Sequence, residues 1–480
     1  MKNILSILIC STAMLLSCKK SFIEIRPEAT VTVDILYKTD KDFQDAVNGC
    51  YNVLQNQYQN FWVFGDLPAD DVSEDIPNHF DHVTFDQFTV NDRQPILAST
   101  WRNYYNLINR ANTIISNIDK ADVSLVKNKD RYVGEAKFLR ALAYFDLVRI
   151  FGDVPMITTN LTVEESYKVG REKTDKVYGE VIIKDLLDAD GKLPPKYTGV
   201  DVGRATKGAA KSLLGKVYLT RKDFVNAEAK LKEVTAMGYS LLPNFSNLWN
   251  YTVDEHHSEY IFDIEYEEAI GEGSVFTHTF SPSWTALTTL YGIRGGTPSN
   301  DGAPTPGLFA AFDPADARRN ISVLYGITVN GVFTAIPTNS IQASKSFSTK
   351  YITPVASNND SRANWKVIRY ADVLLMYAEA LNENGKTTEA LTYLNQVHTR
   401  AGLQAYTALT QSDAREKIYL ERRLELFLEG QRWFDLVRTG RALATLQPLG
   451  MKAHMTVFPI PLTQIQIINN KEIFPQNPGY

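Results

Sequence analysis

The sequence predicts a mostly α-helical protein, built from tetratricopeptide-like helical repeat pairs and a loop-rich subdomain with short strands. Three observations predict this fold class. Many segments place apolar residues at the spacing of one helix face, two of them share a repeat frame, and the stretch 271–368 is rich in Gly, Pro, Ser, Thr and Asn. A chain of 480 residues is also long enough to bury a large core.

Helical periodicity runs through much of both halves of the chain. Ser412 and Asp413 are suited to open the last helical segment, and Gly440 can end it. The expected helices are 40–57, 98–119, 131–151, 174–189, 206–220, 224–236, 370–383, 387–401 and 412–439.

A repeat frame recurs in two places within these helices. Small residues stand where the two helices of a hairpin would touch, and large residues fill the space between, as in a tetratricopeptide repeat. A single match would also fit an ordinary helical hairpin, but two matches favour stacked pairs that form a curved scaffold. The helix 131–151 resembles the first helix of a third pair. The two sets are Leu214, Gly215, Tyr218, Ala227 and Leu231, and Tyr377, Ala378, Leu381, Ala390 and Leu394.

The mature chain is predicted to form one domain, residues 18–480. Its helical frame lies at about 40–236 and 365–440, and a loop-rich insertion lies at about 240–365. Loops longer than about 15 residues without secondary structure are uncommon in compact domains. We therefore expect the insertion to be a subdomain with short strands, such as 321–332.

The N-terminus has the pattern of a secretory signal. Lys2 precedes an apolar run from Ile4 to Leu16, which is too short for a membrane-spanning helix of about 20 residues. Leu15-Leu16-Ser17-Cys18 resembles the lipobox of bacterial lipoproteins, so we predict a signal peptide at 1–17 and a lipid on Cys18. Stable anchoring needs more than one acyl chain. Plain secretion after a different cleavage is the alternative.

The remaining composition excludes several classes of protein. Cys10 leaves with the signal and Cys18 carries lipid, so Cys50 has no partner for a disulfide. The net charge is −5 and there is no long basic block, so nucleic acid is not expected as a partner. Walker, G-x-S-x-G and HExxH motifs do not occur, and the turn 271–276 lacks the third glycine of a dinucleotide loop. No cofactor is expected.

Four long motifs resemble the SusD/RagB family of outer-membrane nutrient-binding lipoproteins. They are "WRNYYNLINRAN" at 101–112, "EAKFLRALAYFDLVRIFGDVP" at 135–155, "VIRYADVLLMYAEALNE" at 367–383 and "ERRLELFLEGQRWFDLVRTG" at 421–440. The resemblance implies four helical repeat pairs and a more variable, loop-rich half. It also implies an outer-membrane location that faces the exterior, a lipid as the only membrane attachment, and a partner: a SusC-like, TonB-dependent transporter barrel under the lipoprotein.

The last motif is dense in charge, and we interpret its charges as structural. At i,i+3 spacing, Arg422 with Glu425 and Arg432 with Asp435 can pair along the helix surface. Leu420, Leu424, Phe427 and Leu428 form the expected buried stripe of the same helix, and Trp101, Tyr105 and Trp433 are also expected in the core.

Two polar clusters in the sequence are candidate metal sites. His79 and His82 are spaced H-x-x-H, but the segment between Pro77 and Thr84 is predicted to be a loop, so metal ligation is not expected. Asp70, Asp71, Glu74 and Asp75 form the densest acidic run. Hard cations favour clustered carboxylates, but the calcium-loop pattern is absent, and we predict no metal.

The candidate ligand-binding residues are aromatic and acidic. Trp284 and Tyr291 lie in "SPSWTALTTLYGIRGG", where we expect mobile, exposed rings that stack on sugar. The family resemblance supports this region but no individual position. Asp70 and Asp71 are possible acceptors for ligand hydroxyls. Trp62, shortly before them in the chain, is a candidate for a second edge of the ligand-binding surface. The alternative is that Trp284 and Tyr291 fix the insertion onto the helices.

The predicted function is capture of a nutrient, most simply an oligosaccharide, and its delivery to the transporter without catalysis. A peptide-capture protein of the same fold is the first alternative. A helical glycoside hydrolase is less favoured, because it needs two carboxylates that face one bond and the sequence does not reveal such a pair. A repeat scaffold for protein assembly is the third alternative.

Overall fold

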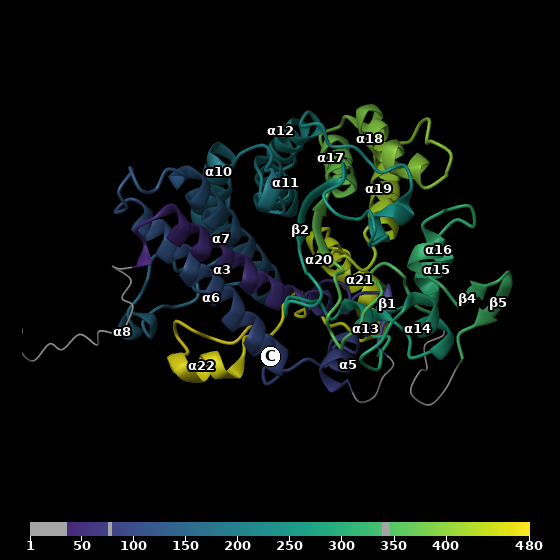
Figure 1. Cartoon of the computed structure of the whole chain (residues 1–480), viewed down its shortest axis with the longest axis horizontal. Coiled ribbons are helices and arrows are strands. Elements are labelled where there is room, and N and C mark those ends of the chain that lie inside the picture. Colours follow the sequence, from purple (N-terminus) through teal and green to yellow (C-terminus); the bar gives the residue numbers. More distant parts are fainter. Residues whose placement is uncertain (1–35, 75–78, 338–345) are drawn as a thin grey trace, which may run out of the picture.

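A continuous array of helices forms the larger part of the protein. The computed structural model describes residues 36–74, 79–337 and 346–480. Each long helix packs on the next from the left side of Figure 1 to its upper right. In order they are α3 (Asp40–Tyr58), α6 (Pro95–Ile118), α7 (Lys129–Phe151), α10 (Ile183–Lys192), α11 (Lys207–Thr220), α12 (Phe224–Thr235), α17 (Tyr370–Glu383), α18 (Thr387–Arg400) and α19 (Gln411–Glu425).

The predicted repeat pairs are confirmed. Helix α11 packs on α12, α17 packs on α18, and α7 packs on α10 as the third pair. Gly215 shows why the frame needs a small residue, because a Cβ there would lie 2.5 Å from a methyl carbon of Leu231. Ala227, Ala378 and Ala390 are fully buried at the equivalent contacts. The frame is therefore a steric requirement of close helix packing.

Side-chain caps begin several of these helices, and the last of them is not the one predicted. The Thr39 hydroxyl accepts from the Asp42 amide in a capping box, and Thr206 accepts from the Ala209 amide. Thr410 accepts from the Asp413 amide, so α19 begins at Gln411 rather than at Ser412. Such a cap stabilises a helix by about 1 kcal/mol.

The prediction of one helix over 412–439 is wrong. Helix α19 ends at Glu425, and α20 (Arg432–Arg438) begins only after a turn in which Leu428 and Gly430 have φ of 58° and 72°. The Lys350 ammonium donates to the carbonyls of Glu425 and Phe427 at 3.2 and 2.6 Å. The positive φ of Leu428 and Gly430 is not helical, and a buried donor from the insertion satisfies carbonyls at the end of the helix that lack an intrahelical partner.

The described residues form three short antiparallel pairs of strands, and each pair includes a strand of the insertion, as the prediction of a strand-containing subdomain required. The segment 321–332 is not one strand, because it begins in a helix and then enters a hairpin. The pairs are β1 (Val72–Ser73) with β3 (Ala303–Pro304), β2 (Tyr260–Ile264) with β6 (Trp365–Arg369), and β4 (Gly326–Val329) with β5 (Val332–Ala335). The β1–β3 pair joins the insertion to the segment between α3 and α6.

Shorter helices cover the right-hand and lower parts of Figure 1. They are α4 (Trp62–Gly65), α5 (Phe80–Asp86), α8 (Val163–Ser166), α9 (Thr174–Val177), α13 (Phe276–Phe280), α14 (Thr285–Tyr291), α15 (Pro306–Ala311), α16 (Arg319–Ser322), α21 (Ala442–Leu446) and α22 (Leu462–Ile468). A π-helical turn, Tyr178–Ile182, joins α9 to α10. The predicted helix 174–189 is thus a composite of three pieces.

Within the described part of the chain, the buried hydrophobic residues form two clusters of unequal size. The main core runs through the helical array and includes Trp101 and Trp433, as predicted. The second cluster lies within the insertion and contains Trp284, Leu287, Ile293, Ile327, Ile336, Phe347, Ile352 and Val355. The insertion therefore has its own small core in addition to its contacts with the array.

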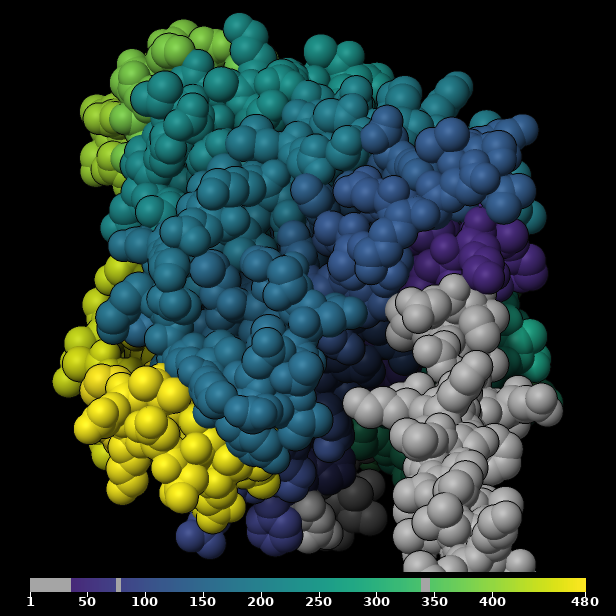
Figure 2. Space-filling view, turned by 90° about the vertical axis from the view of Figure 1, so that its left-hand side faces the viewer, coloured from purple at the N-terminus to yellow at the C-terminus, as the bar shows by residue number. Residues whose placement is uncertain are grey.

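The C-terminal segment returns to the first half of the chain. Figure 2 shows it, in yellow, beside the blue segments of that half. The Arg171 amide donates to the Ile473 carbonyl at 2.9 Å, and the Arg171 guanidinium donates to the Pro475 carbonyl at 2.6 Å. Across the described ranges, no helix is both long and apolar enough to cross a membrane. Cys18 lies outside the described residues.

Candidate functional site

Asp70 and Asp71 bind arginines rather than facing outward. They follow α4, and the Arg432 guanidinium donates to both oxygens of Asp70 at 2.8 and 3.0 Å. The Arg423 Nε donates to Asp71 at 2.7 Å. Burial alone would raise the pKa of Asp70, but Arg432 outweighs it and lowers the pKa below its ordinary value. These carboxylates tie the segment after α4 to α19 and α20, and their use as sugar acceptors stays a prediction.

Trp62 lies in the core, so the exposed edge expected there is wrong. Only 1% of the residue is exposed, and its ring meets those of His82 and Phe280 edge-on at 4.9 and 5.4 Å. A Cβ at Gly302 would lie 3.2 Å from the Trp62 ring. Trp62 therefore packs the segment before β3 onto α4.

Trp284 is also buried, with 9% exposure, so the exposed ring expected there is wrong. It precedes α14 and packs in the second cluster, where Tyr291 is a partly buried neighbour at the other end of that helix. Trp62 belongs to the main core instead. The candidate aromatics thus occupy two separate clusters and do not form one platform. Ligand binding by Trp284 stays a prediction that its burial does not favour.

The arginine–carboxylate network of α19 and α20 is structural, as interpreted, but its predicted pairs are wrong. Arg422 donates to Asp435 and Asp372 rather than to Glu425, and Arg432 donates to Asp70. The network also reaches far along the chain instead of following one helix surface. It consists of two sets of ion pairs, one around Glu425 and one around Asp435. The first set is Glu259, Asp316, Arg318, Lys350, Arg369, Arg400, Glu421, Glu425 and Glu429. The second set is Asp372, Glu379, Arg422, Asp435 and Arg438.

Glu425 lies at the centre of this network and is fully buried. Arg318 and Arg400 approach its carboxylate at 2.9 and 2.5 Å, and Arg369 is a third partner. Burial opposes ionisation, but the charges of Arg400, Arg369 and Arg318 lower the pKa of Glu425 well below its ordinary value. The network thus compensates each buried charge and joins the insertion to the helical array.

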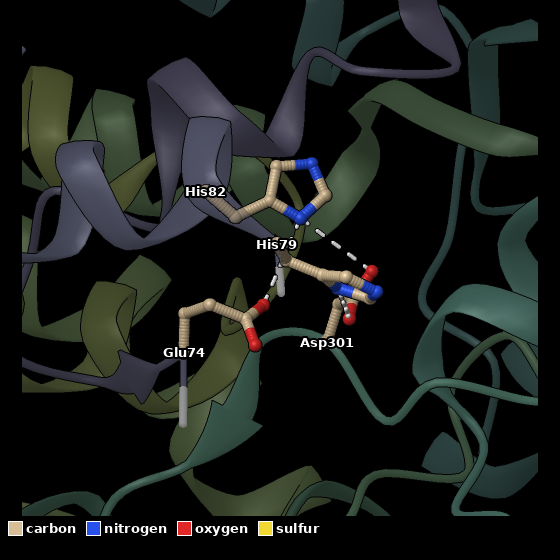
Figure 3. A group of neighbouring side chains, drawn as sticks. All are labelled: Glu74, His79, His82 and Asp301. Atoms are coloured by element: carbon tan, nitrogen blue, oxygen red, sulfur yellow. Dashed lines mark hydrogen bonds and ion pairs between the residues drawn. The ribbon is translucent and has the colours of Figure 1, made fainter. Parts of the chain in front are cut away.

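The structure does assemble a different polar group, which we call the His–carboxylate cluster: Glu74, His79, His82 and Asp301. Figure 3 shows the four side chains converging from the β1–α5 region and the segment before β3. One ligand atom from each residue lies within 4.8 Å of the others. The loop predicted between Pro77 and Thr84 is wrong from Phe80 onward, because α5 begins there and carries His82.

The distances in the His–carboxylate cluster are of two kinds. His79 Nδ1 lies 2.7 Å from Asp301 Oδ1, which is a hydrogen bond. His82 Nδ1 lies 3.7 Å from Glu74 Oε2 and 3.5 Å from Asp301 Oδ2. Burial alone would lower the pKa of His82, but the neighbouring carboxylates of Asp301 and Glu74 outweigh it and raise the pKa to about 9.

Backbone pairing positions this cluster. Strand β1 pairs Val72 with Pro304 and Ser73 with Ala303, which brings Glu74 beside the residues before β3. The Asp301 amide donates to the Thr279 carbonyl at 2.7 Å. The H-x-x-H spacing was visible in the sequence, but Asp301 is 222 residues from His79 and carried no local signal.

An exposed aromatic ring borders the His–carboxylate cluster. Phe80 follows His79 and is 74% exposed. Its exposure was not predicted, since one phenylalanine in a polar segment gives no signal of exposure. A large exposed ring is a suitable surface for a flat ligand face.

Comparison with known proteins identifies the family. A model described as the SusD family matches residues 334–480, and one described as starch-binding and associating with the outer membrane matches residues 21–219. A solved laminarin-binding SusD-like protein is 30% identical, with a TM-score of 0.81 over 92% of this chain and 100% of that chain. The chain belongs to the SusD family. The family predicted from its motifs is thus confirmed.

Curated relatives of this SusD-family protein match along most of their length. SusD-like protein P2 of Formosa agariphila is 28% identical over 96% of both chains. A SusD-like protein of Bacteroides ovatus is 25% identical over 92% of this chain and 83% of the relative. The surface glycan-binding protein A of Bacteroides thetaiotaomicron, solved with laminarihexaose, shares the fold at 23% identity and a TM-score of 0.78 over 92% of this chain and 100% of that chain.

Proposed function

We propose that this protein is a lipid-anchored glycan-binding protein on the outer face of the outer membrane. It captures an oligosaccharide and passes it to a SusC-like, TonB-dependent transporter, and it catalyses no reaction. The observation that carries this proposal is the likeness to the laminarin-binding SusD-like protein, which extends over 92% of the chain. The likeness includes the insertion as well as the helical frame.

Within this proposal, Tyr291 and Phe80 contact the ligand. Tyr291 ends α14 and is only partly buried. Phe80 begins α5 and is 74% exposed. A stacked ring contributes about 1 kcal/mol beyond its buried area. Such modest contacts suit a protein that must release its ligand to a transporter.

The absence of catalysis in the proposal is supported by the state of the acidic candidates. Glycoside hydrolysis requires two carboxylates on either side of one sugar bond, one of them able to donate a proton. Asp71 has 1% exposure and binds Arg423, while Asp70 is held ionised by Arg432. Arginines hold both carboxylates, so neither is placed to donate a proton to a sugar bond.

Titration with laminarin oligosaccharides tests the ligand class. Wild type should bind, and Tyr291→Ala and Phe80→Ala should each weaken binding about tenfold. Phe80→Ala should leave the melting temperature unchanged, whereas Tyr291→Ala should lower it modestly, because Tyr291 packs partly against the second cluster. Tyr167→Ala is the matched control, because Tyr167 is 50% exposed on the separate α8 region. Its affinity should equal that of wild type.

Trp284→Ala separates packing from binding. Truncating a buried tryptophan costs about 3–5 kcal/mol of stability, so the melting temperature should fall while the folded fraction keeps its affinity. A loss of affinity with an unchanged melting curve would instead assign Trp284 to the ligand. Retention of peptides but no glycan would favour the peptide-capture alternative, and new saccharide products would show an enzyme.

The anchor and the transporter need tests in cells. Cys18→Ala should move the protein out of the outer-membrane fraction in a strain that lacks the transporter, because no lipid then holds it. Full retention in that strain would contradict the anchor. Detergent extracts of wild-type cells should yield a complex of this protein with a SusC-like barrel, and its absence would contradict the delivery step.

A further inference from the structure

We propose that the His–carboxylate cluster is a binding site for one divalent transition-metal ion of the zinc class. The proposal rests on the geometry of Glu74, His79, His82 and Asp301. It does not depend on the proposed glycan function, since neither the ligands nor their spacing involves the exposed rings.

The donor set selects the class of metal. Two imidazole nitrogens and two carboxylate oxygens are the ligand types of Zn²⁺, in a four-ligand arrangement that suits a tetrahedral ion. Calcium and magnesium favour sites made wholly of oxygen. The side chains of Glu74 and Asp301 are only 0% and 6% exposed, so water has little access to their oxygens.

The distances around His82 match a shared metal better than a shared proton. An N–H···O hydrogen bond is about 2.7–3.2 Å long, but His82 Nδ1 is 3.7 Å from Glu74 Oε2 and 3.5 Å from Asp301 Oδ2. Two ligand atoms each about 2.0–2.1 Å from a tetrahedral zinc are separated by about 3.3 Å. The distances from His82 Nδ1 to the two oxygens are thus close to the distance expected between two ligand atoms of one zinc ion.

Only a small closure is needed to complete the site. The ligand atoms already lie within 4.8 Å of one another. His79 and Asp301 must exchange their 2.7 Å hydrogen bond for two bonds to the ion. His79 is the most exposed of the four, with 33% of its side chain accessible, so it leaves a path for the ion. Trp62 packs against the His82 ring and fixes its direction.

A bound ion would join two distant segments of the chain. His79 and His82 belong to the α5 region, and Asp301 precedes β3, 222 residues later than His79. Among the described residues, the short β1–β3 pair is the strand pairing that already connects these regions. The metal would also fix the backbone that presents Phe80. Metal binding should therefore raise the melting temperature in proportion to the logarithm of free metal.

Zinc and cobalt binding to the full-length protein tests the proposal. Detergent-purified protein is stripped with a chelator, dialysed against Zn²⁺ and assayed for bound zinc, and its affinity is measured by competition with a chelating dye. We expect one zinc per chain. Co²⁺ should give the visible absorption of a tetrahedral site, and saturating Zn²⁺ should raise the melting temperature.

Variants assign the ion to this cluster. His82→Ala should weaken zinc binding more than about 100-fold, because loss of a mere supporting residue already costs about 10–100-fold. His79→Ala and Asp301→Asn should each weaken it at least about tenfold and abolish the cobalt absorption. His256→Ala is the matched control, since His256 also pairs with a carboxylate, Glu265, at 2.7 Å. It should bind like wild type.

Three outcomes would overturn the site. The first is that wild type binds no zinc, in which case the cluster holds only a proton. The second is that zinc binding survives in His82→Ala and His79→Ala. The third is that His256→Ala removes zinc binding. Far-UV circular dichroism checks the fold of each variant. If His82→Ala does not fold, His79→Ala carries the test, because its partly exposed side chain leaves no buried cavity.

Discussion

The arginine–carboxylate network and the His–carboxylate cluster both bury acidic side chains, but they give them different partners. In the network, Glu425 meets three guanidinium groups, and Asp435 meets those of Arg422 and Arg438 at 2.9 and 2.7 Å. In the cluster, Glu74 and Asp301 meet imidazoles, two of the contacts being longer than a hydrogen bond.

The difference teaches how a buried carboxylate can serve either structure or binding. A guanidinium is always charged and satisfies a carboxylate in a fixed, planar geometry, so the pair is complete without any ligand. An imidazole can instead give up its proton, and the nitrogen lone pair that this frees can bind a metal. The network thus fixes the fold, whereas the cluster can be completed by a cation.

Breaking the centre of the network should have the largest effect. Glu425→Gln leaves three buried guanidiniums facing a neutral amide, and removal of one partner from a buried ion pair costs about 3–5 kcal/mol. The free energy of unfolding, measured by urea titration, should fall by that amount. The exposed pair of Glu416 with Arg441 is the control, and Glu416→Gln should change it by less than about 1 kcal/mol. Equal effects would show that the network does not stabilise the fold.

Acid should weaken the network through Asp435. Burial opposes ionisation, but Arg422 and Arg438 hold the pKa of Asp435 far below its ordinary value. Its stabilising contribution is therefore present above the unfolded pKa of about 4 and is lost as the pH falls toward the folded pKa. Asp435→Asn should cost about 2–3 kcal/mol at pH 7.

This cost should shrink steadily in urea titrations between pH 5 and pH 3. A constant difference across those pH values would contradict the assignment. Ligand affinity of the folded Asp435→Asn protein should equal that of wild type.

Asp66 lies next to the network without an arginine, and its pH dependence should have the opposite sign. Burial raises the pKa of Asp66 to about 8, although the Gly430 amide donates to it at 2.7 Å. Its contribution to stability is present below the unfolded pKa of about 4 and is lost as the pH rises through the folded pKa. Asp66→Asn should therefore gain at least about 1 kcal/mol relative to wild type between pH 4 and pH 8. Parallel pH profiles of the two proteins would contradict this.

The smallest effect is expected in the metal-free cluster. His79 is partly exposed and makes one hydrogen bond to Asp301. Without metal, His79→Ala should change the free energy of unfolding by less than about 1 kcal/mol. With saturating zinc, the same substitution should lose the metal-induced rise in melting temperature. A large loss without metal would make the cluster structural, like the network.

The main features of the fold were predictable because they depend on local order. The spacing of Gly215, Ala227, Ala378 and Ala390 identified helix pairs, since close packing needs small residues at fixed intervals whatever the rest of the chain does. Thr39 and Thr410 likewise act on amides three residues away. The motifs at 101–112, 135–155, 367–383 and 421–440 were sufficient to predict the family.

The sequence by itself thus determined the helical frame, the strand-containing insertion and the family, whereas only the tertiary structure decided where each polar and aromatic side chain is used. Helix periodicity did not reveal that α19 would end at Glu425 or that Lys350 would donate to the carbonyls of Glu425 and Phe427. Nor did it reveal that Trp284 would be buried or that Asp301 would meet His79. Such contacts join residues far apart in the chain, and their energies depend on burial and charge that exist only once the segments have packed together.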